Sequence, residues 1–426
     1  MKHPFQILIS DSSHEHIFAS ATNRLMVFSA IDGKLIGSWT DLVDAQEFQE
    51  SRFKARIEKQ PKREEVEKAE NATKRLKTNK KEPKVPAPGA GAPPIYYYIR
   101  SLTLSRNETY LIGTTDSDKA AVIFKIDYTQ ENCIQLIKRQ VFPKRLCSVL
   151  TTLDDTKVVV ADKFGDVYEI SAINTEVVAE KDLVPILGHV SMLSEVVVAE
   201  HDGKQYVLTG DRDEHIKVSH YPKSYVVRNW LFGHHEFVSC LHICSFNKDI
   251  LISGGGDDYL ILWDWWAKKQ LARVGLRELM APLLTDSHLP PERFRRDSPS
   301  REISISKVTV YEHGDTRLMV VLCENTNCLL TFKIHTEMNV EHHQTFETSL
   351  PIVDFVVLSD SILAAVDVET DTELLQLYKF DDDGTLHLTE SPLTKEITIS
   401  VDCEVLGRAE FYPLYYISSF RKRSEH

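Results

Sequence analysis

The segment Gly233–Trp266, GHHEFVSCLHICSFNKDILISGGGDDYLILWDWW, constrains the fold more than any other part of the chain. Apolar residues alternate with other residues in Phe237–Cys244 and again in Tyr259–Trp263, which is the period-two pattern of strands that bury one face. The glycines Gly254–Gly256 are predicted to supply the positive φ angles of a tight turn between two strands. The segment therefore predicts short antiparallel strands joined by turns.

Four further positions complete a known pattern. A Gly-His dipeptide opens the segment, a serine ends one strand, an aspartate lies in the turn and a tryptophan follows. In WD repeats these side chains form a buried hydrogen-bond chain, which here would comprise His234, Ser253, Asp257 and Trp263. Buried polar groups need partners, so all four are interpreted as structural. The segment is predicted to be one blade of a WD-repeat β-propeller.

The strand–turn–strand pattern recurs, and each copy ends at a residue that corresponds to Trp263. These residues are Phe28, Phe124, Ile170, Ser219, Phe332 and Tyr378. Successive ends lie 96, 46, 49, 44, 69 and 46 residues apart, and four of these spacings are close to the roughly 40–45 residues of one blade. The sequence predicts an all-β fold, a single seven-bladed WD-repeat propeller over residues 1–426. In the copy that ends at Ser219, Asp213 is predicted to correspond to Asp257.

Two insertions account for the long spacings. Residues 44–94, between blades 1 and 2, are Lys/Glu-rich and then Pro/Gly-rich, with 13 Lys or Arg against 6 Glu from Ser51 to Val85. This composition cannot bury enough apolar surface to offset the entropy of ordering, so the insertion is predicted to be disordered. Residues 279–301 are predicted to form a loop over one face of the propeller.

The first insertion contains a basic cluster. It fits a nuclear-import signal or a nonspecific RNA-contacting arm, and a solvated loop with neither role is the alternative. The cluster comprises Lys74, Arg75, Lys77, Lys80 and Lys81.

The chain ends offer candidates for ring closure. A propeller normally closes by pairing a strand from one terminus with strands from the other, which leaves no open sheet edge. Phe5–Ser10 and residues 411–426, predicted as a C-terminal strand and basic tail, are the candidates. The aromatic residues of FYPLYYISSFRKR either belong to the core of the last blade or stack on RNA beside the basic residues.

Composition excludes several classes of protein. The most apolar long stretch, Leu350–Val368, contains three aspartates, so no membrane span is predicted, and the N-terminus does not resemble a secretory signal. Seven scattered cysteines favour a reducing compartment. Cys240, His242 and Cys244 alternate on one strand, but buried thiols are far commoner there than a metal site. No metal and no cofactor are predicted.

No catalytic constellation is present in the sequence. Gly254–Gly256 are followed by two aspartates instead of Lys-Ser/Thr, so they are not a phosphate-binding loop. A nucleophile elbow, an HExxH pair and a dinucleotide-binding glycine pattern are missing. The chain is therefore predicted not to be an enzyme. A propeller hydrolase with metal ligands at the channel is the rival, which an assay with and without chelator would test.

Lys217 is the most unusual position. It occupies the place that Ile261 has in the reference blade, where an ammonium costs desolvation unless it finds a carboxylate. Pairing within the blade with Asp211, Asp213 or Glu214 is one possibility. The second possibility is that Lys217 pairs with a carboxylate of another protein.

Several motifs resemble a specific family, the WD-repeat non-catalytic subunit of the fungal two-protein tRNA (guanine-N7)-methyltransferase. The resemblance runs from the N-terminus to the tail, and DKFGDVY and DRDEHIKVSHYP are its most specific parts. The motifs are IYYYIR at 95–100, ADKFGDVY at 161–168, ILGHVSML at 186–193, TGDRDEHIKVSHYP at 209–222, LFGHHEFVS at 231–239 and YPLYYISSFRK at 412–422.

The resemblance implies a scaffold in a heterodimer. In that family a separate methyltransferase binds S-adenosylmethionine and modifies a guanosine in the tRNA variable loop, and the propeller holds it in its active form. Lys217 would form a salt bridge with an acidic residue of that subunit. A nuclear location, with the cytoplasm as a further compartment, is expected. Weaker candidates for the interface are Asp211, Arg212, His189, Lys163 and Asp166.

A generic WD-repeat adaptor, such as a ubiquitin-ligase substrate receptor, is the alternative function. Such receptors commonly carry Trp-Asp-x-Arg at a blade end. In this chain Trp263-Asp264-Trp265 is followed by Trp266, which counts against this alternative.

Overall fold

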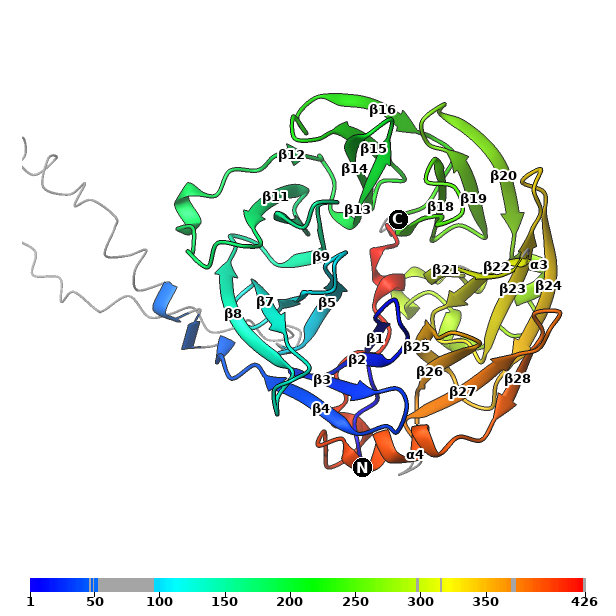
Figure 1. Ribbon diagram of the computed structural model, residues 1–426. Helices are drawn as coiled ribbons and strands as arrows, with labels where there is room; N and C mark the ends of the chain where they lie inside the picture. The colour runs from blue at the N-terminus through cyan, green and yellow to red at the C-terminus, as the bar shows by residue number, and fades with distance from the viewer. Residues whose placement is uncertain are drawn as a thin grey trace, which may run out of the picture.

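Seven four-stranded antiparallel sheets surround a central channel in the described part of the chain (Figure 1). The structure is a computed structural model that describes residues 1–426 except 46, 49, 53–95, 296–298, 315, 369–372 and 424–426. Each sheet is built from consecutive strands and forms one blade. The predicted seven-bladed propeller is confirmed.

The strands of each blade follow one another from the channel outward. Blade 1 comprises β1 (Ile7–Ser10), β2 (His16–Ala21), β3 (Arg24–Ser29) and β4 (Leu35–Thr40). Blade 2 comprises β5 (Ile99–Leu104), β6 (Tyr110–Thr115), β7 (Ala120–Ile126) and β8 (Ile134–Val141). Blade 3 comprises β9 (Leu146–Thr151), β10 (Lys157–Asp162), β11 (Asp166–Ser171) and β12 (Leu187–Gly188). Blades 4 and 5 comprise β13 (Leu193–His201), β14 (Lys204–Asp211), β15 (Ile216–His220), β16 (Val227–Leu231); and β17 (Val238–Ile243), β18 (Ile250–Gly255), β19 (Tyr259–Asp264), β20 (Lys269–Gly275). Blades 6 and 7 comprise β21 (Ile305–His313), β22 (Thr316–Cys323), β23 (Cys328–Ile334), β24 (Val340–Glu347); and β25 (Ile352–Val357), β26 (Ser361–Val366), β27 (Leu375–Phe380), β28 (Leu386–Thr389).

The core lies between neighbouring blades. Phe18 and Val27 of blade 1, for example, pack in one buried cluster with Leu111 and Phe124 of blade 2. Trp263 and the six residues predicted to correspond to it each lie in the third strand of a blade. The period-two pattern therefore located every blade, because each strand buries side chains against an adjacent sheet.

Ring closure differs from the prediction. Phe5–Ser10 supplies β1, which pairs with β2 as the innermost strand of blade 1 and lies beside β25 of blade 7, where the Leu8 N–H donates to Asp354 at 2.7 Å. The C-terminal strand predicted within 411–426 is wrong, since the described residues of this stretch form no strand. Blade 7 already takes all four strands from β25–β28, so no strand position remains for a terminus.

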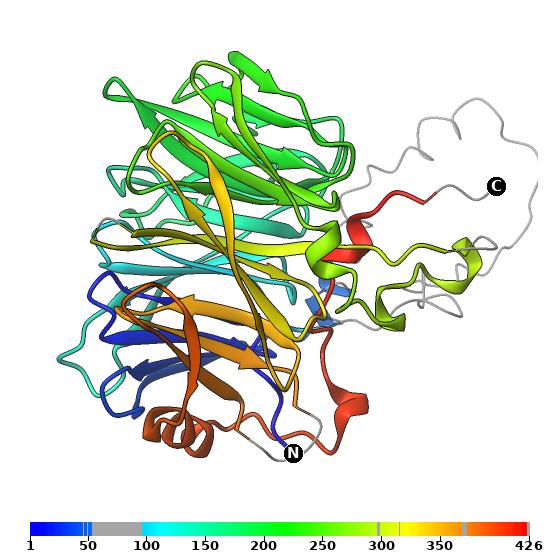
Figure 2. The same ribbon diagram turned by 90° about the vertical axis from the view of Figure 1, so that its right-hand side faces the viewer.

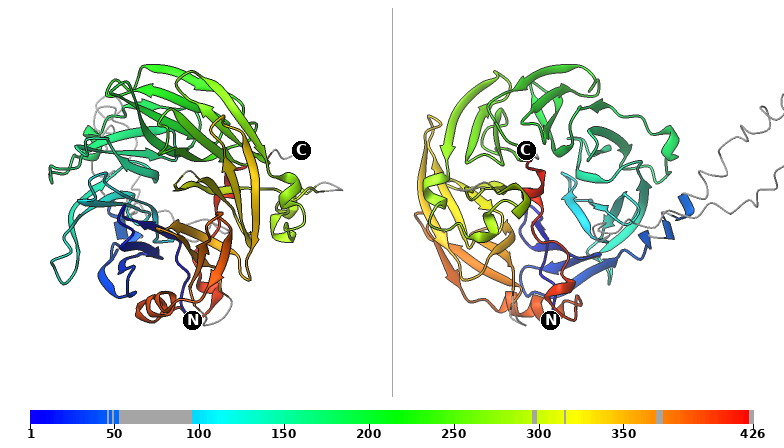
Figure 3. Two further views of the ribbon diagram at one scale, coloured as in Figure 1. Left: turned by 45° about the vertical axis from the view of Figure 1, so that its right-hand side comes forward. Right: turned by 180° about the vertical axis from the view of Figure 1, so that it is seen from behind.

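After α4 (Pro392–Ser400) and η4 (Arg408–Glu410), residues 411–423, here called the tail, cross the mouth of the channel and include η5 (Ile417–Phe420). Figure 2 shows the disc from the side with the tail on one face, and the right panel of Figure 3 looks onto that face. The β14–β15 and β18–β19 turns also lie there, because they contact the tail. This side is called the tail face.

The second insertion packs against the tail face and contains α3 (Arg277–Met280), η2 (Asp286–His288) and η3 (Glu292–Phe294) (Figure 2). Met280 and Leu284 bury their side chains in the cluster between blades 5 and 6. The predicted loop is therefore present and has short helical turns.

The first insertion lies mostly outside the described residues, and its basic cluster 74–81 falls entirely outside them. Its first residues are ordered, contrary to the prediction for 44–94. The Phe48 N–H donates to the Asp44 carbonyl at 2.9 Å, and Arg52 pairs with Glu180 of η1 (Glu180–Asp182). These local contacts offset the entropy of ordering at the start of the segment.

All seven cysteines are free. Cys240 and Cys244 are buried in and just after β17, and burial raises the pKa of each thiol to about 12. No helix within the described ranges is long and apolar enough to cross a membrane.

A cavity of about 940 Å³ occupies the channel and is lined by residues of all blades and the tail, including Glu195 of β13. Ser148 donates a hydrogen bond to the Glu195 carboxylate. Burial nevertheless raises the Glu195 pKa from 4.5 to about 7, against the effect of this bond.

Replacing Glu195 by glutamine is expected to stabilise the protein at pH 8 but not at pH 4.5. Between pH 4.5 and 7 the folded state holds more protons than the unfolded state, so stability falls as pH rises, and the full penalty is present above pH 7. Removing it should add about 3 kcal/mol to the unfolding free energy at pH 8. Thermal unfolding at the two pH values checks this, and an equal shift at both would contradict it.

Candidate partner-binding surface

The reference network in blade 5 has the predicted geometry. His234 Nδ1 lies 2.7 Å from Asp257, its Nε2 lies 2.7 Å from Ser253 Oγ, and Trp263 Nε1 donates to Ser253 Oγ at 2.8 Å. All four residues are buried. Burial raises the pKa of Asp257, but the hydrogen bond and charge of His234, together with hydrogen bonds from the His235 N–H and Tyr259, outweigh it, and the pKa is lowered. The four side chains are therefore joined in the hydrogen-bond chain that the WD pattern predicts.

Replacing Ser253 by alanine is expected to lower the unfolding free energy by about 2–3 kcal/mol, because it leaves Trp263 Nε1 and His234 Nε2 buried without partners. Denaturant midpoints check this. Ser219 is the control, since its hydroxyl is buried in β15, the third strand of blade 4, and has no hydrogen-bond partner among the described residues. Ser219→Ala should therefore cost nothing measurable. Similar losses for both variants would contradict the network.

The glycines of the reference turn act differently from the prediction. None of Gly254–Gly256 has a positive φ. Instead, a Cβ on Gly255 would lie 1.8 Å from the Phe237 carbonyl oxygen. Gly255 is therefore required by the close approach of two backbones, not by turn conformation.

Blade 4 contains a second network of the same kind. His189 Nδ1 lies 2.9 Å from Asp211, and its Nε2 lies 2.7 Å from Thr209 Oγ1. Asp211, not Asp213, thus plays the part of Asp257, because the acidic side chain comes from the end of β14 instead of the turn. The side chains of His189 and Asp211 are only 1% and 3% exposed. Both predicted interface residues are therefore engaged inside the blade.

The register confirms the unusual position of Lys217. Lys217 pairs with Thr209 on one side and Trp230 on the other, as Ile261 pairs with Ser253 and Arg273 in blade 5. Its Nζ donates to the Gly188 carbonyl and lies 4.8 Å from the centre of the Trp230 ring.

Lys217 has no carboxylate partner among the described residues. Asp211 binds His189, and Asp213 pairs with Lys422 and accepts from Ser191, each at 2.6 Å. Lys217 is only 6% exposed, and burial lowers the pKa of its ammonium, with Asp211 opposing this effect. A buried cation without a counter-ion is costly, so the site favours an incoming carboxylate.

Exposed apolar side chains lie beside Lys217. Trp230 and Phe232 are parallel with ring centres 6.4 Å apart, and Phe232 is 62% exposed. Val190 is fully exposed in the loop that follows Gly188. These four residues, Lys217, Trp230, Phe232 and Val190, are called the blade-4 surface. Apolar groups gathered around a buried charge are typical of a protein interface.

A glycine sets the position of this loop. Gly165 of the DKFGDVY motif has φ +107°, and a Cβ on it would lie 2.5 Å from the His189 carbonyl oxygen. The His189 N–H donates to the Gly165 carbonyl at 2.7 Å. The β10–β11 turn therefore holds the loop that carries Gly188 and Val190 against Lys217.

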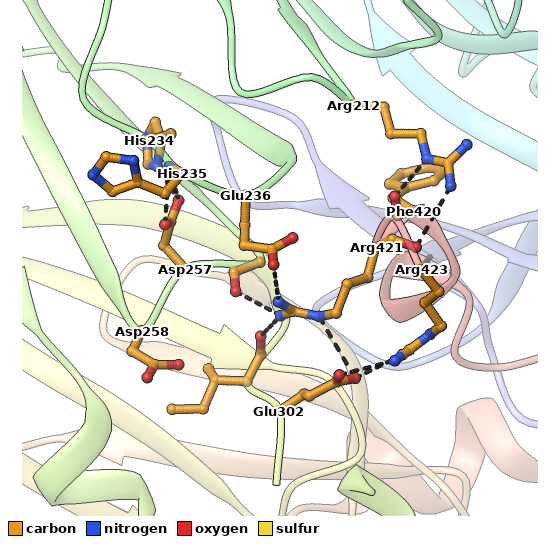
Figure 4. A network of polar contacts seen from close by, with 12 residues as sticks. Arg212, His234, His235, Glu236, Asp257, Asp258, Glu302, Phe420, Arg421 and Arg423 are labelled. Carbon is orange, nitrogen blue, oxygen red and sulfur yellow. Dashed lines mark hydrogen bonds and ion pairs between the residues drawn. The ribbon is translucent and has the colours of Figure 1, made fainter. Parts of the chain in front are cut away.

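The other predicted interface residues have different surroundings. Arg212 donates to the Phe420 carbonyl at 2.6 Å and so binds the tail (Figure 4). Lys163 is exposed in the β10–β11 turn, and Asp166 is half-buried beside Gly188. Lys163 and Asp166 thus border the blade-4 surface.

The basic end of the tail is paired within the protein, which the sequence did not indicate (Figure 4). Arg421 pairs with Glu236 at 2.8 Å and donates to the carbonyls of Gly256 and Ile303. Arg423 forms two bonds to Glu302, at 2.6 and 2.9 Å. Residues predicted as possible RNA contacts therefore hold the tail on its own propeller.

Comparison with known proteins agrees with this geometry. The family described as "tRNA methyltransferase TRM82 WD40 domain" matches residues 17–185 and 174–386. The chain belongs to the TRM82 family. TRM82 relatives named "tRNA (guanine-N(7)-)-methyltransferase non-catalytic subunit TRM82" are 51% identical in Debaryomyces hansenii, 46% in Meyerozyma guilliermondii and 34% in Saccharomyces cerevisiae. These alignments cover all of this chain and 99–100% of each TRM82 relative.

Solved structures agree with this chain in fold alone. "Structure of U3-55K" and "Crystal structure of RRP9 WD40 repeats" each give a TM-score of 0.55, at 14% and 15% identity. Each covers 86% of this chain, and the matched parts are 89% and 88% of those chains.

Proposed function

We propose that this chain is the non-catalytic subunit of a tRNA (guanine-N7)-methyltransferase, and that it binds and stabilises the active form of a separate catalytic subunit. The observation that carries the proposal is full-length identity of up to 51% to relatives with that name. This support favours the scaffold role over a ubiquitin-ligase receptor.

The blade-4 surface is the proposed docking site. An acidic side chain of the catalytic subunit would reach Lys217, which has no carboxylate partner in the described chain. Apolar side chains of that subunit would cover Trp230, Phe232 and Val190. Lys163 and Asp166, at the border of the surface, are further candidate contacts.

The mechanism is a population shift. If the catalytic subunit exists in active and inactive conformations, preferential binding of the active one raises its population by the difference in affinity. S-adenosylmethionine would bind to the catalytic subunit, and tRNA would be modified by the heterodimer. A nuclear location, directed by the basic cluster at 74–81, is part of the proposal.

Reconstitution tests this function. The catalytic subunit, this chain and their mixture are each supplied with S-adenosylmethionine and unmodified tRNA, and N7-methylguanosine is measured. Only the mixture is expected to be fully active, and the two proteins should co-elute as a heterodimer. Full activity of the catalytic subunit alone, or failure of the two chains to associate, would contradict the proposal.

A further inference from the structure

We propose that a basic patch on blades 2 and 3 binds the sugar-phosphate backbone of the tRNA that the heterodimer methylates. The patch comprises Lys119, Lys144, Arg145 and Lys163 around Phe164. This inference rests on the proposed function and adds a direct RNA contact by the propeller.

Three loops of the tail face bring these residues together. Lys119 ends the β6–β7 turn, Lys144 and Arg145 lie in the β8–β9 connection, and Lys163 is in the β10–β11 turn. The Phe142 N–H donates to the Lys119 carbonyl at 3.0 Å, and the Lys163 N–H donates to the Arg145 carbonyl at 3.0 Å. The backbones that carry the cations therefore occupy fixed relative positions.

The charge of the patch is not neutralised by the described part of the chain. Lys119, Lys144 and Lys163 form no ion pair there. Arg145 has one long contact of 3.5 Å with Asp116, which already accepts two bonds from Arg100. Burial, and then the neighbouring Arg145, Arg100 and Lys144, lower the pKa of Lys163.

The tail provides the contrast. Its arginines and lysine are each paired with a carboxylate of the propeller. The whole chain has a formal net charge of −13, so a group of uncompensated cations on one face is a local exception. Such a patch attracts a polyanion to this face.

Phe164 gives the patch its preference for nucleic acid. Its side chain is 56% exposed, with Lys144 Nζ 4.1 Å and Lys163 Nζ 5.9 Å from the ring centre. An exposed ring between ammonium groups offers stacking to a base or ribose and ionic contacts to the flanking phosphates. The neighbouring Gly165 contacts the loop of the blade-4 surface, so RNA held by a docked catalytic subunit would pass close to the patch.

The test uses the reconstituted heterodimer with Lys119→Ala/Lys144→Ala, which leaves Lys163 and Lys217 in place. We expect the tRNA dissociation constant to rise about tenfold near 0.1 M salt, and the slope of log K against log salt to fall by about 2. Heterodimer assembly and kcat at saturating tRNA should be unchanged. Phe164→Ala should weaken binding without changing the salt slope, because an aromatic ring releases no counter-ions.

Lys204→Ala/Lys268→Ala is the matched control, since both lysines are exposed at the opposite ends of their blades. It should leave tRNA affinity unchanged. Unchanged tRNA affinity and an unchanged salt slope in the Lys119/Lys144 variant would overturn this inference. The proposed function is tested separately, by the activity of the wild-type complex. Dissociation of the heterodimer in that variant would also overturn it, because the patch would then be a protein interface.

Discussion

Replacing Lys217 by glutamate is expected to abolish heterodimer formation at micromolar concentrations. The variant places a carboxylate where the docking partner is proposed to present its own, in a site that excludes water. Losing one member of a buried ion pair costs about 2–5 kcal/mol, and like charges add to the loss, so the dissociation constant should rise at least a hundredfold. Size-exclusion chromatography with the catalytic subunit, and methylation of tRNA by the mixture, measure this effect.

Two further variants separate binding from folding. Lys217→Met keeps the packing of the aliphatic stem against Trp230 and removes the buried charge, so the propeller should be at least as stable as the wild type. It should still weaken the heterodimer. Lys223→Glu changes an exposed lysine at the opposite end of the same blade and should have no effect. Normal association of the methionine variant would remove Lys217 from its assigned role.

Deleting the tail after Glu410 is expected to lower the unfolding free energy by about 5 kcal/mol or more. Glu324 of blade 6 is buried, and its carboxylate accepts from the backbone N–H groups of Tyr416, Ile417 and Ser418 at 2.5, 2.6 and 2.8 Å. Burial raises its pKa against these bonds. Without the tail, Glu324 loses these donors and Glu302 loses both of its arginine partners, and a buried unpaired polar group costs about 1–3 kcal/mol or more when charged.

The midpoint of thermal unfolding measures this loss. Lys422→Ala removes an exposed ion pair, whose lysine side chain is 59% accessible, and should change stability by no more than about 1 kcal/mol. Adding Glu324→Gln to the truncated chain should recover part of the stability, because the amide carries no charge. A truncated protein with an unchanged midpoint would contradict the proposed strength of the tail contacts.

Local sequence patterns predicted the blades because each strand repeats one physical requirement, an apolar face against the next sheet. The position of Lys217 also followed from this repeat. Asp211 could not be distinguished from Asp213 in this way, because blade 4 takes its acid from the end of β14, two residues earlier in the repeat than Asp257 in the turn of blade 5. The tail has no hydrophobic periodicity. Its contacts join residues such as Arg212 and Phe420 that are 208 positions apart in the chain.

The role of Gly255 was also beyond the sequence. Three adjacent glycines fit a positive-φ turn and a close backbone approach equally well, and only the position of the Phe237 carbonyl distinguishes them. The pairing of Arg421 and Arg423 depends in the same way on Glu236 and Glu302, which are distant in sequence. Composition showed that the tail is basic, but not which carboxylates pair with it.

The tail follows all seven blades in the sequence, and its anchors come from His3, just before blade 1, and from blades 4, 5 and 6. All four must have folded before it can bind. The blades therefore complete the toroid first, and the tail fastens it afterwards. Loss of the tail would leave a full set of sheets with an unlatched centre, which would open more readily and be cleaved sooner by proteases.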